Sequence, residues 1–555
     1  MDKLGSSSEV AVYALGIIVS LILFALSYQL VLHPLKNYPG PFIAKFTDGY
    51  GGYHAVNKRL HLATYLDHLK YGPVYRQAPN RLIFNTSSAL RAIYLHPSIN
   101  KAHIYAHTQF NPQVNIFGTL ERERHRQKRK IYGKVLSERS LRSFEPTMSS
   151  EIDVFLKLLL DTKNEAVNMS PLCERLTTDV AGQLAFGQPL DTQTEERNRA
   201  FPRAMISMNG LVSIFTLPQD AKHDFYSIAG GEVGEGIESL GRSELWAEAV
   251  FFIPAGELCQ SPESLLLAYW IASKLAFSKA LSMLNRSVFS DPYLSVMGII
   301  NTKYILPGGT TLSAALSSLF FYLSRHPIAY TLLATEIRDT FSSGLDIKSG
   351  AQLSSCKYLR ACIDETLRIS PPFLATFWRE PYSDHTEPFV VDGHVTPRGI
   401  MVGVNPYCVM HNEEYFPEPF AFRPERWLTS EEGSFRHQLT SHLLKSTPTE
   451  EQNLASMRAA FAPFALGDTG CLGKAMAYHE TSLAIATTLW YFDFKKASGE
   501  AGKLGEGQPG NMNGRDRVDE YQLLDLAVAD HDGPNLVFAP RGEYWQELSD
   551  GGLKV

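Results

Sequence analysis

The stretch of sequence that decides the fold is Phe464-Ala-Leu-Gly-Asp-Thr-Gly-Cys471-Leu-Gly-Lys474. A phenylalanine leads into a glycine-rich loop that one cysteine closes, and Leu472–Glu480 predicts the start of a helix. Glycines at 467, 470 and 473 predict a backbone with positive φ that passes close to a flat ligand. Amides of a loop that enters a helix stabilise a negatively charged sulfur. This geometry suits a thiolate that binds haem iron, although a lone cysteine is more often a buried side chain in a turn.

The spacing F-x-x-G-x-x-x-C-x-G-K outweighs that alternative, and it resembles the haem-binding loop of cytochrome P450 enzymes. The resemblance implies that Cys471 is the axial ligand of the haem iron. It also assigns Phe464, Gly467 and Gly473 to the haem-binding loop. The family has Arg or His two residues before the cysteine, whereas this chain has Thr469. We therefore expect one contact to the haem propionates to be missing.

The simplest interpretation of the basic run Glu121–Lys130 is a helix face exposed to solvent. The run also resembles the family's helix that contacts a haem propionate, and the matching positions are His125 and Arg129. Arginine suits this role because its guanidinium binds a carboxylate through two hydrogen bonds. As an alternative role for this helix, we expect Lys128 and Lys130 to be exposed and to help dock an acidic redox partner.

Two further motifs occur in the family's order before the cysteine loop. Glu365 and Arg368 are three residues apart, which by itself predicts only a surface ion pair worth a few tenths of a kcal/mol. With Phe422-Arg-Pro-Glu-Arg-Trp427 they resemble the ExxR and PERF motifs of the family. The resemblance implies a buried network of Glu365, Arg368 and Arg426 that is structural and not catalytic.

The segment Pro372–Arg379 predicts an apolar strand. In the family this segment lines the substrate pocket, and its terminal arginine contacts a haem propionate, which assigns Arg379. Further side chains expected to face substrate or haem are Leu374, Ala375, Phe377, Phe110, Ile116 and Phe117. These apolar residues suit a hydrophobic substrate without naming one.

Two separated stretches, Ser243–Gly256 and Gly309–Pro327, resemble the halves of the family's long central helix. Joined, they match the oxygen-activation motif, with Thr310 in the usual place of an acid and Thr311 as the hydroxyl that hydrogen-bonds dioxygen and relays protons. A plainer role for two helical threonines is a hydrogen bond to a helix carbonyl. Without the acid, we expect the proton path to depend more on water.

Residues 257–308 separate these halves and show no resemblance to the family. We interpret them as a retained intron, paired with a lost exon near Phe215, or as a genuine insertion. The distinction matters physically, because an interrupted helix loses the continuous hydrogen-bond ladder that would hold Thr311 in place.

The segment Val10–Leu32 carries no charge and is long enough to span a bilayer. It lacks a cleavage signal, so we expect residues 1–33 to be a retained single-pass anchor and residues 34–555 to be the catalytic domain. Flanking lysines favour a cytosolic catalytic domain at the endoplasmic reticulum membrane. The following Tyr38-Pro-Gly-Pro41 resembles the hinge of microsomal members, and Phe42–Asp48 looks like filamentous-fungal ones.

Composition excludes several other classes. The chain has 555 residues, 44% hydrophobic residues and a net charge of −6, which gives no reason to expect nucleic-acid binding. Its 6 cysteines are scattered without C-x-x-C spacing, which argues against a zinc site or a disulfide framework.

The resemblance implies a mainly α fold with small β-sheets around a buried haem b. It implies a monooxygenase that hydroxylates or epoxidises a hydrophobic small molecule with O2. NADPH would supply the electrons through a separate NADPH–cytochrome P450 reductase, with cytochrome b5 as a further partner. By analogy the pathway is fungal secondary metabolism of terpenoids, polyketides or alkaloids. Two alternatives stay open: a haem-thiolate isomerase or dehydratase without reductase, and a non-catalytic membrane-anchored haem protein.

Overall fold

The computed structural model describes residues 13–108, 115–199, 308–382, 387–429 and 449–550, apart from isolated positions 14, 18, 21, 22, 25, 188 and 527. The α-helices are α2 Gly49–Val56, α3 Leu60–Tyr71, α4 Ser87–Tyr94, α5 Arg122–Val135, α6 Glu138–Leu160, α7 Met169–Phe186, α13 Gly308–Arg325, α14 Pro327–Thr340, α15 Ala351–Ser355, α16 Lys357–Ile369, α17 Pro406–Met410, α19 Thr449–Ala460, α20 Lys474–Tyr491 and α21 Gln546–Asp550. The strands are β1 Val74–Ala78, β2 Arg81–Phe84, β3 Ile99–Lys101, β4 Ala166–Asn168, β5 Arg379–Pro381, β6 Phe389–Val391, β7 His394–Thr396, β8 Met401–Val404, β9 Phe492–Lys496, β10 Leu523–Leu526, β11 Val528–His531 and β12 Asn535–Pro540. The prediction of a mainly α fold with small sheets is confirmed.

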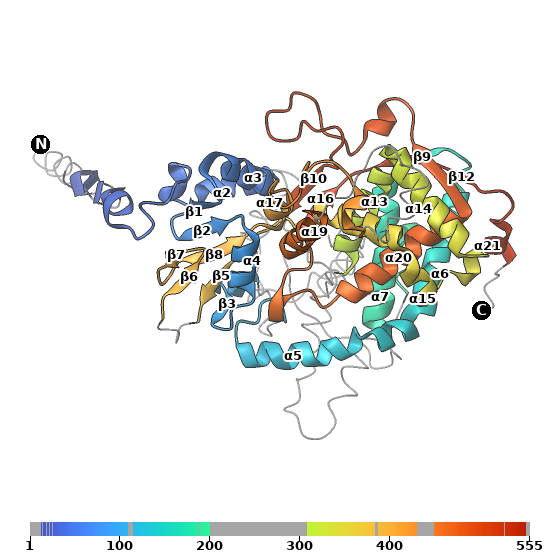
Figure 1. Ribbon diagram of the computed structural model, residues 1–555, viewed down its shortest axis with the longest axis horizontal. Helices are drawn as coiled ribbons and strands as arrows, with labels where there is room; N and C mark the ends of the chain where they lie inside the picture. The colour runs from blue at the N-terminus through green and yellow to red at the C-terminus, as the bar shows by residue number, and fades with distance from the viewer. Residues whose placement is uncertain are drawn as a thin grey trace, which may run out of the picture.

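The strands form one five-stranded sheet, of order β1-β2-β8-β5-β3, and three smaller ones. In the large sheet β3 and β5 are antiparallel, and Lys101 lies directly opposite Arg379. Figure 1 shows this sheet with α2, α3 and α4 at one end of the molecule and the helices around α13 at the other. The helix α5 runs along one side between the two ends (Figure 1).

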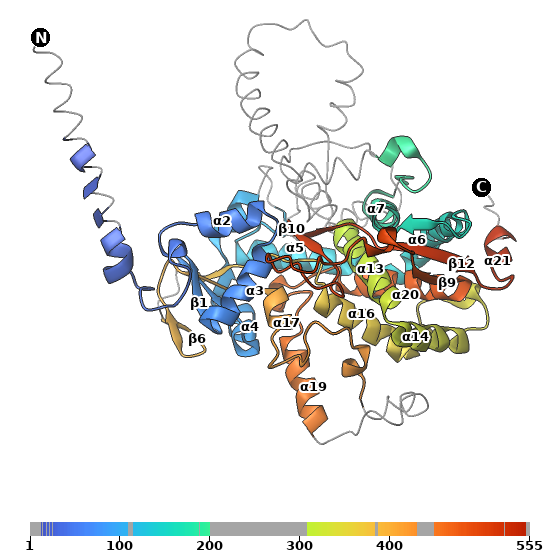
Figure 2. The same ribbon diagram turned by 90° about the horizontal axis from the view of Figure 1, so that it is seen from above.

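The helix α13 lies in the core of the helical end. Its residues Leu316, Leu319, Phe320 and Phe321 are all fully buried, as expected for a helix that is apolar on every side. It packs against α7, α16 and α20, and Figure 2 shows it among them. The prediction of a helix over Gly309–Pro327 is confirmed up to Arg325, after which Pro327 starts α14. The predicted first half, Ser243–Gly256, and residues 257–307 lie outside the described residues.

The segment before Arg379 corrects one expectation. Pro372–Trp378 was expected to be a strand, but only Phe373 pairs there, in an isolated bridge with Val528. Regular strand structure begins at Arg379. The carbonyls of Leu374 and Phe377 accept hydrogen bonds from the side chains of Asn405 and Tyr94 instead of from a neighbouring strand.

The predicted membrane anchor is not confirmed by the structure. In the described parts of the chain, no helix combines the length and the apolar character needed to cross a bilayer. Part of Val10–Leu32 lies outside the described residues, so the anchor stays a prediction.

Candidate active site

The cysteine loop runs from the end of α19 to the start of α20. The Cys471 amide donates a hydrogen bond of 2.8 Å to the Phe464 carbonyl, which closes the loop. Gly467 has a φ of +69°, and a Cβ there would lie 2.4 Å from the carbonyl oxygen of Tyr94, so only glycine fits. The same expectation is wrong for Gly470 and Gly473, whose φ values are −64° and −79°. Gly473 instead caps α20.

The Cys471 thiol faces an internal cavity. The side chain has accessible surface, and it lines a cavity of about 250 Å³. Burial of the sulfur among surrounding protein atoms raises the pKa of the Cys471 thiol. The amides of Gly473 and Lys474 and the charge of Arg129 act in the opposite direction. The predicted amide contacts to the sulfur are therefore present, and a bound metal cation would complete the stabilisation of a thiolate.

Thr311 lines the same cavity from α13, together with Leu312 and Ala315. One cavity thus joins the sulfur with the threonine that the sequence singled out. Thr310 is not among the lining residues, and its buried Oγ1 makes no hydrogen bond to any described residue. Among the described residues, no helix carbonyl accepts a bond from this hydroxyl; the carbonyls three and four residues earlier in the chain lie outside them.

Cationic side chains gather where α5 and β5 meet the cysteine loop. Arg129 donates a hydrogen bond of 2.6 Å to the Gly470 carbonyl. Arg379 donates through Nη2 to the Thr469 hydroxyl at 2.8 Å, and through Nη1 to the Tyr105 hydroxyl at 3.2 Å. Both guanidinium groups and His125 line the cavity, so the three residues predicted to contact propionates are brought together.

The electrostatics of this region fit a group with carboxylates. Burial first, and then the nearby charges of Lys101, Arg129 and Arg379, together lower the pKa of His125 to about 3. The hydrogen-bond partners of Arg129 and Arg379 named above are neutral oxygens. An anion bound here would meet concentrated positive charge, and the two propionates of haem satisfy this requirement.

Sequence reasoning missed two features of this region. Thr469, expected only to remove a contact, accepts a hydrogen bond from Arg379 and so ties the cysteine loop to β5. Lys101 also lines the cavity, which became visible only with the β3–β5 register. The expectation that Lys128 is exposed is wrong, since it is 0% exposed on the inward face of α5. Lys130 is exposed as expected.

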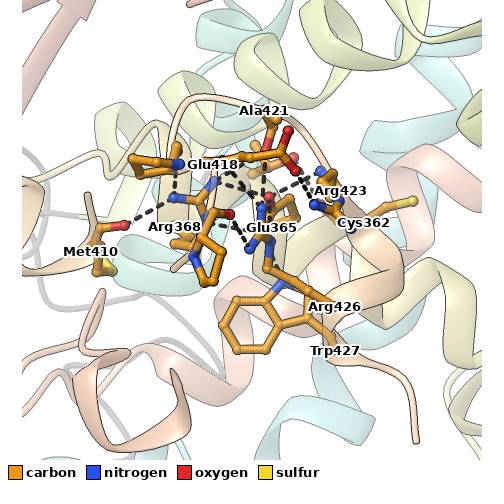
Figure 3. A network of polar contacts seen from close by, with 12 residues as sticks. Cys362, Glu365, Arg368, Met410, Glu418, Ala421, Arg423, Arg426 and Trp427 are labelled. Carbon is orange, nitrogen blue, oxygen red and sulfur yellow. Dashed lines mark hydrogen bonds and ion pairs between the residues drawn. The ribbon is translucent and has the colours of Figure 1, made fainter. Parts of the chain in front are cut away.

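The predicted network behind the cavity is present and buried (Figure 3). Arg368 Nε and Arg426 Nε lie 2.9 Å and 3.1 Å from the Glu365 carboxylate, and the Glu365 and Arg368 side chains are 0% exposed. Trp427 Nε1 donates to the same carboxylate at 2.9 Å. Arg368 also donates to the Met410 carbonyl at 2.9 Å. None of these network residues lines the cavity, in keeping with a structural role.

A cysteine on a cavity with a cationic end, opposed by a threonine helix and backed by a buried Glu–Arg network, defines a haem-thiolate protein. The sequence profile described as Cytochrome P450 matches residues 53–239 and 300–515. The chain belongs to the cytochrome P450 family and is an oxidoreductase of the monooxygenase type, for which haem is the family's cofactor.

Full-length relatives come from filamentous fungi. The chain is 30% identical to the cytochrome P450 monooxygenase AKT7 of Alternaria alternata over 95% of this chain and 96% of the relative. It is 31% identical to the monooxygenase poxM of Penicillium oxalicum over 94% and 93%. It is 30% identical to the monooxygenase apf7 of Gibberella fujikuroi over 97% and 99%. The prediction of a fungal cytochrome P450 is confirmed.

Proposed function

We propose that this protein hydroxylates or epoxidises a hydrophobic small molecule with O2, in fungal secondary metabolism, using electrons from NADPH that a separate reductase delivers. The observation that carries the proposal is the single cavity shared by Cys471 and Thr311. Its remaining wall is largely apolar: Phe373 and Phe377 stack there with ring centroids 4.4 Å apart. Such a wall suits an apolar substrate held by a few polar groups.

Each polar residue of the cavity has a separate task in this proposal. Cys471 would hold the iron through its sulfur, with the amides of Gly473 and Lys474 stabilising the negative charge. His125, Arg129 and Arg379 would bind and orient the propionates. Haem bound in this way supplies the activation of dioxygen. The Thr311 hydroxyl would hold a proton on the far side of the cavity.

The decisive experiment measures conversion of a panel of apolar compounds by the full chain with cytochrome P450 reductase. We expect products that gain one oxygen atom from O2, only when NADPH, O2 and reductase are all present. Added cytochrome b5 should raise the rate. Lack of a reduced, CO-bound thiolate spectrum would refute the haem-thiolate site itself.

A reductase-independent isomerase or dehydratase is the second candidate, favoured by the hydroxyl at Thr310 in place of an acid. It predicts conversion of an oxygenated substrate without NADPH. Turnover that continues when reductase is left out would support this candidate and exclude the monooxygenase for that substrate.

We also propose that Val10–Leu32 anchors the protein in the endoplasmic reticulum membrane with residues 34–555 in the cytosol. Large apolar side chains in this segment, among them Leu15, Ile17 and Phe24, are exposed, which suits contact with lipid. Alkaline extraction of membranes tests this. The full chain should stay in the pellet, and a variant that starts at residue 34 should be released to a larger extent.

We further propose that residues 257–308 are an insertion or a retained intron within the central helix. The family profile leaves residues 240–299 unmatched, which supports a break in this part of the chain. Sequencing of the transcript tests it: a cDNA that contains the whole of 257–308 would rule out the retained intron and leave a genuine insertion.

A further inference from the structure

Lys101 is a buried lysine at the wall of the cavity. It ends β3 opposite Arg379, and its side chain is 4% exposed. Its Nζ donates hydrogen bonds to the carbonyls of Ile116 at 2.6 Å, Phe117 at 2.8 Å and Thr119 at 3.3 Å. Burying an ammonium group is costly unless it is hydrogen-bonded, and these carbonyls meet that need.

The hydrogen-bond donors of the Lys101 ammonium group are used to hold a loop. An ammonium group has three N–H donors and no acceptor. The three hydrogen bonds from Lys101 to loop carbonyls hold the loop, while its charge acts on the cavity. The neighbouring Asn100 adds a second attachment through a hydrogen bond of 2.7 Å from Nδ2 to the Leu120 carbonyl. Two consecutive residues of β3 therefore hold residues 116–120.

The segment held in this way forms part of the cavity wall. Ile116 and Phe117 both line the cavity. The Phe117 ring packs against Tyr105 with centroids 5.0 Å apart, and Tyr105 accepts the hydrogen bond from Arg379. Lys101 therefore holds the backbone of the segment from which these two apolar side chains reach the cavity.

We propose that Lys101 is a positioning residue that determines which bulky ligands the cavity accepts, because it fixes Ile116 and Phe117 in the wall. Charge-assisted hydrogen bonds are about twice as strong as neutral ones, and the substitution Lys101→Met removes all three at nearly constant side-chain volume. Without these bonds residues 116–120 would be less ordered, and a ligand that contacts them would have to order them on binding. This entropic cost weakens the binding of large ligands but not of small ligands that do not reach the segment.

The experiment uses the full chain and two iron-binding probes, imidazole and a bulky aryl-substituted imidazole, followed by the shift of the haem absorption band. For Lys101→Met we expect a Kd for the bulky azole about tenfold higher, the size expected for losing one or two hydrogen bonds. The Kd for imidazole should change by less than about twofold on the same reasoning. Asn100→Ala should also raise the Kd for the bulky azole, but by a smaller factor. Lys348→Met, at an exposed loop position, controls for loss of a charge.

A second measurement needs no haem. Amide hydrogen exchange over residues 116–120 should be faster in Lys101→Met than in the wild type, and unchanged in Lys348→Met. The azole readout rests on the proposed haem site, so a wild type that binds neither azole would count against that site alone. Equal weakening of both azoles, or unchanged exchange over residues 116–120, would overturn the role of Lys101.

Discussion

The cysteine side and the helix side of the site differ in how their polar groups are hydrogen-bonded. On the cysteine side, the Cys471 amide, the Gly470 carbonyl and the Thr469 hydroxyl all have hydrogen-bond partners within the protein. In the opposite helix, next to the lining residue Thr311, the buried Thr310 hydroxyl has no partner among the described residues. The cysteine side is therefore fixed by hydrogen bonds within the protein. At Thr310 the acid expected from the family is missing, and no described residue bonds to the hydroxyl in its place. The predictions below test this contrast.

The largest expected effect comes from removing the sulfur. Cys471→Ala should abolish the reduced, CO-bound thiolate spectrum, because the loop offers no other thiolate to the cavity. Cys356→Ser is the matched control, since Cys356 is buried between helices and does not line the cavity. It should keep the spectrum. An unchanged spectrum in Cys471→Ala would show that the ligand is assigned wrongly.

A smaller loss should follow when the network that supports the cysteine side is broken. Glu365→Gln removes the charge that Arg368 and Arg426 share in a buried site, and such losses typically cost about 3–5 kcal/mol. Glu418→Gln disrupts the exposed pair of Glu418 with Arg423 and should cost about 1 kcal/mol or less. Denaturant unfolding of both variants measures the difference. Similar losses in the two variants would contradict the structural importance of the buried network.

The same contrast explains how far the sequence could be interpreted. Cys471, Glu365 and Arg368 could be found because their roles depend on spacing within one loop or one helix. The burial of Lys128 and the contact of Thr469 could not be predicted, because the surroundings of both side chains come from distant parts of the chain. The burial of Lys128 depends on how α5 packs, and the bond of Thr469 depends on Arg379, which lies far away in sequence. Local spacing contains no information about either.

Lys101 is a second residue whose surroundings could not be predicted from its sequence neighbours. The sequence motifs single out no role for Lys101, and its place at the cavity becomes visible only with the register that sets it opposite Arg379. Long-range strand pairing is fixed by the packing of the whole sheet and not by the residues next to the lysine. The central helix had the opposite outcome, because the resemblance of Gly309–Pro327 to the family's central helix was enough to predict α13.

The charge of the cysteine side should also appear in the pH dependence of stability. Folding depresses the pKa of His125 from 6.5 to about 3, so the unfolded chain binds a proton that the folded chain does not. Stability from this group is complete above pH 6.5 and is lost as the pH falls toward 3. Between pH 7.5 and 5 the ligand-free wild type should lose about 2 kcal/mol more than His125→Asn does. Denaturant unfolding at both pH values tests this, and equal losses would contradict the buried, cationic environment of His125.

The smallest expected effect lies on the helix side and separates its two threonines. Thr311→Ala removes the hydroxyl that lines the cavity. We expect more of the consumed NADPH to appear as hydrogen peroxide, by about two- to tenfold, as for the loss of one hydrogen bond. The ratio is measured with reductase and a substrate that the wild type oxidises, and Thr311→Ser should restore it.

Thr310→Val is the matched comparison on the same helix. It removes a hydroxyl that has no described partner, so the peroxide ratio should change by less than about twofold and stability should be equal or higher. A larger peroxide release in Thr310→Val than in Thr311→Ala would show that Thr310, and not Thr311, has the proton-relay role. That result would mean that the buried hydroxyl at 310 carries protons in place of the missing acid, and the contrast between the two walls would then disappear.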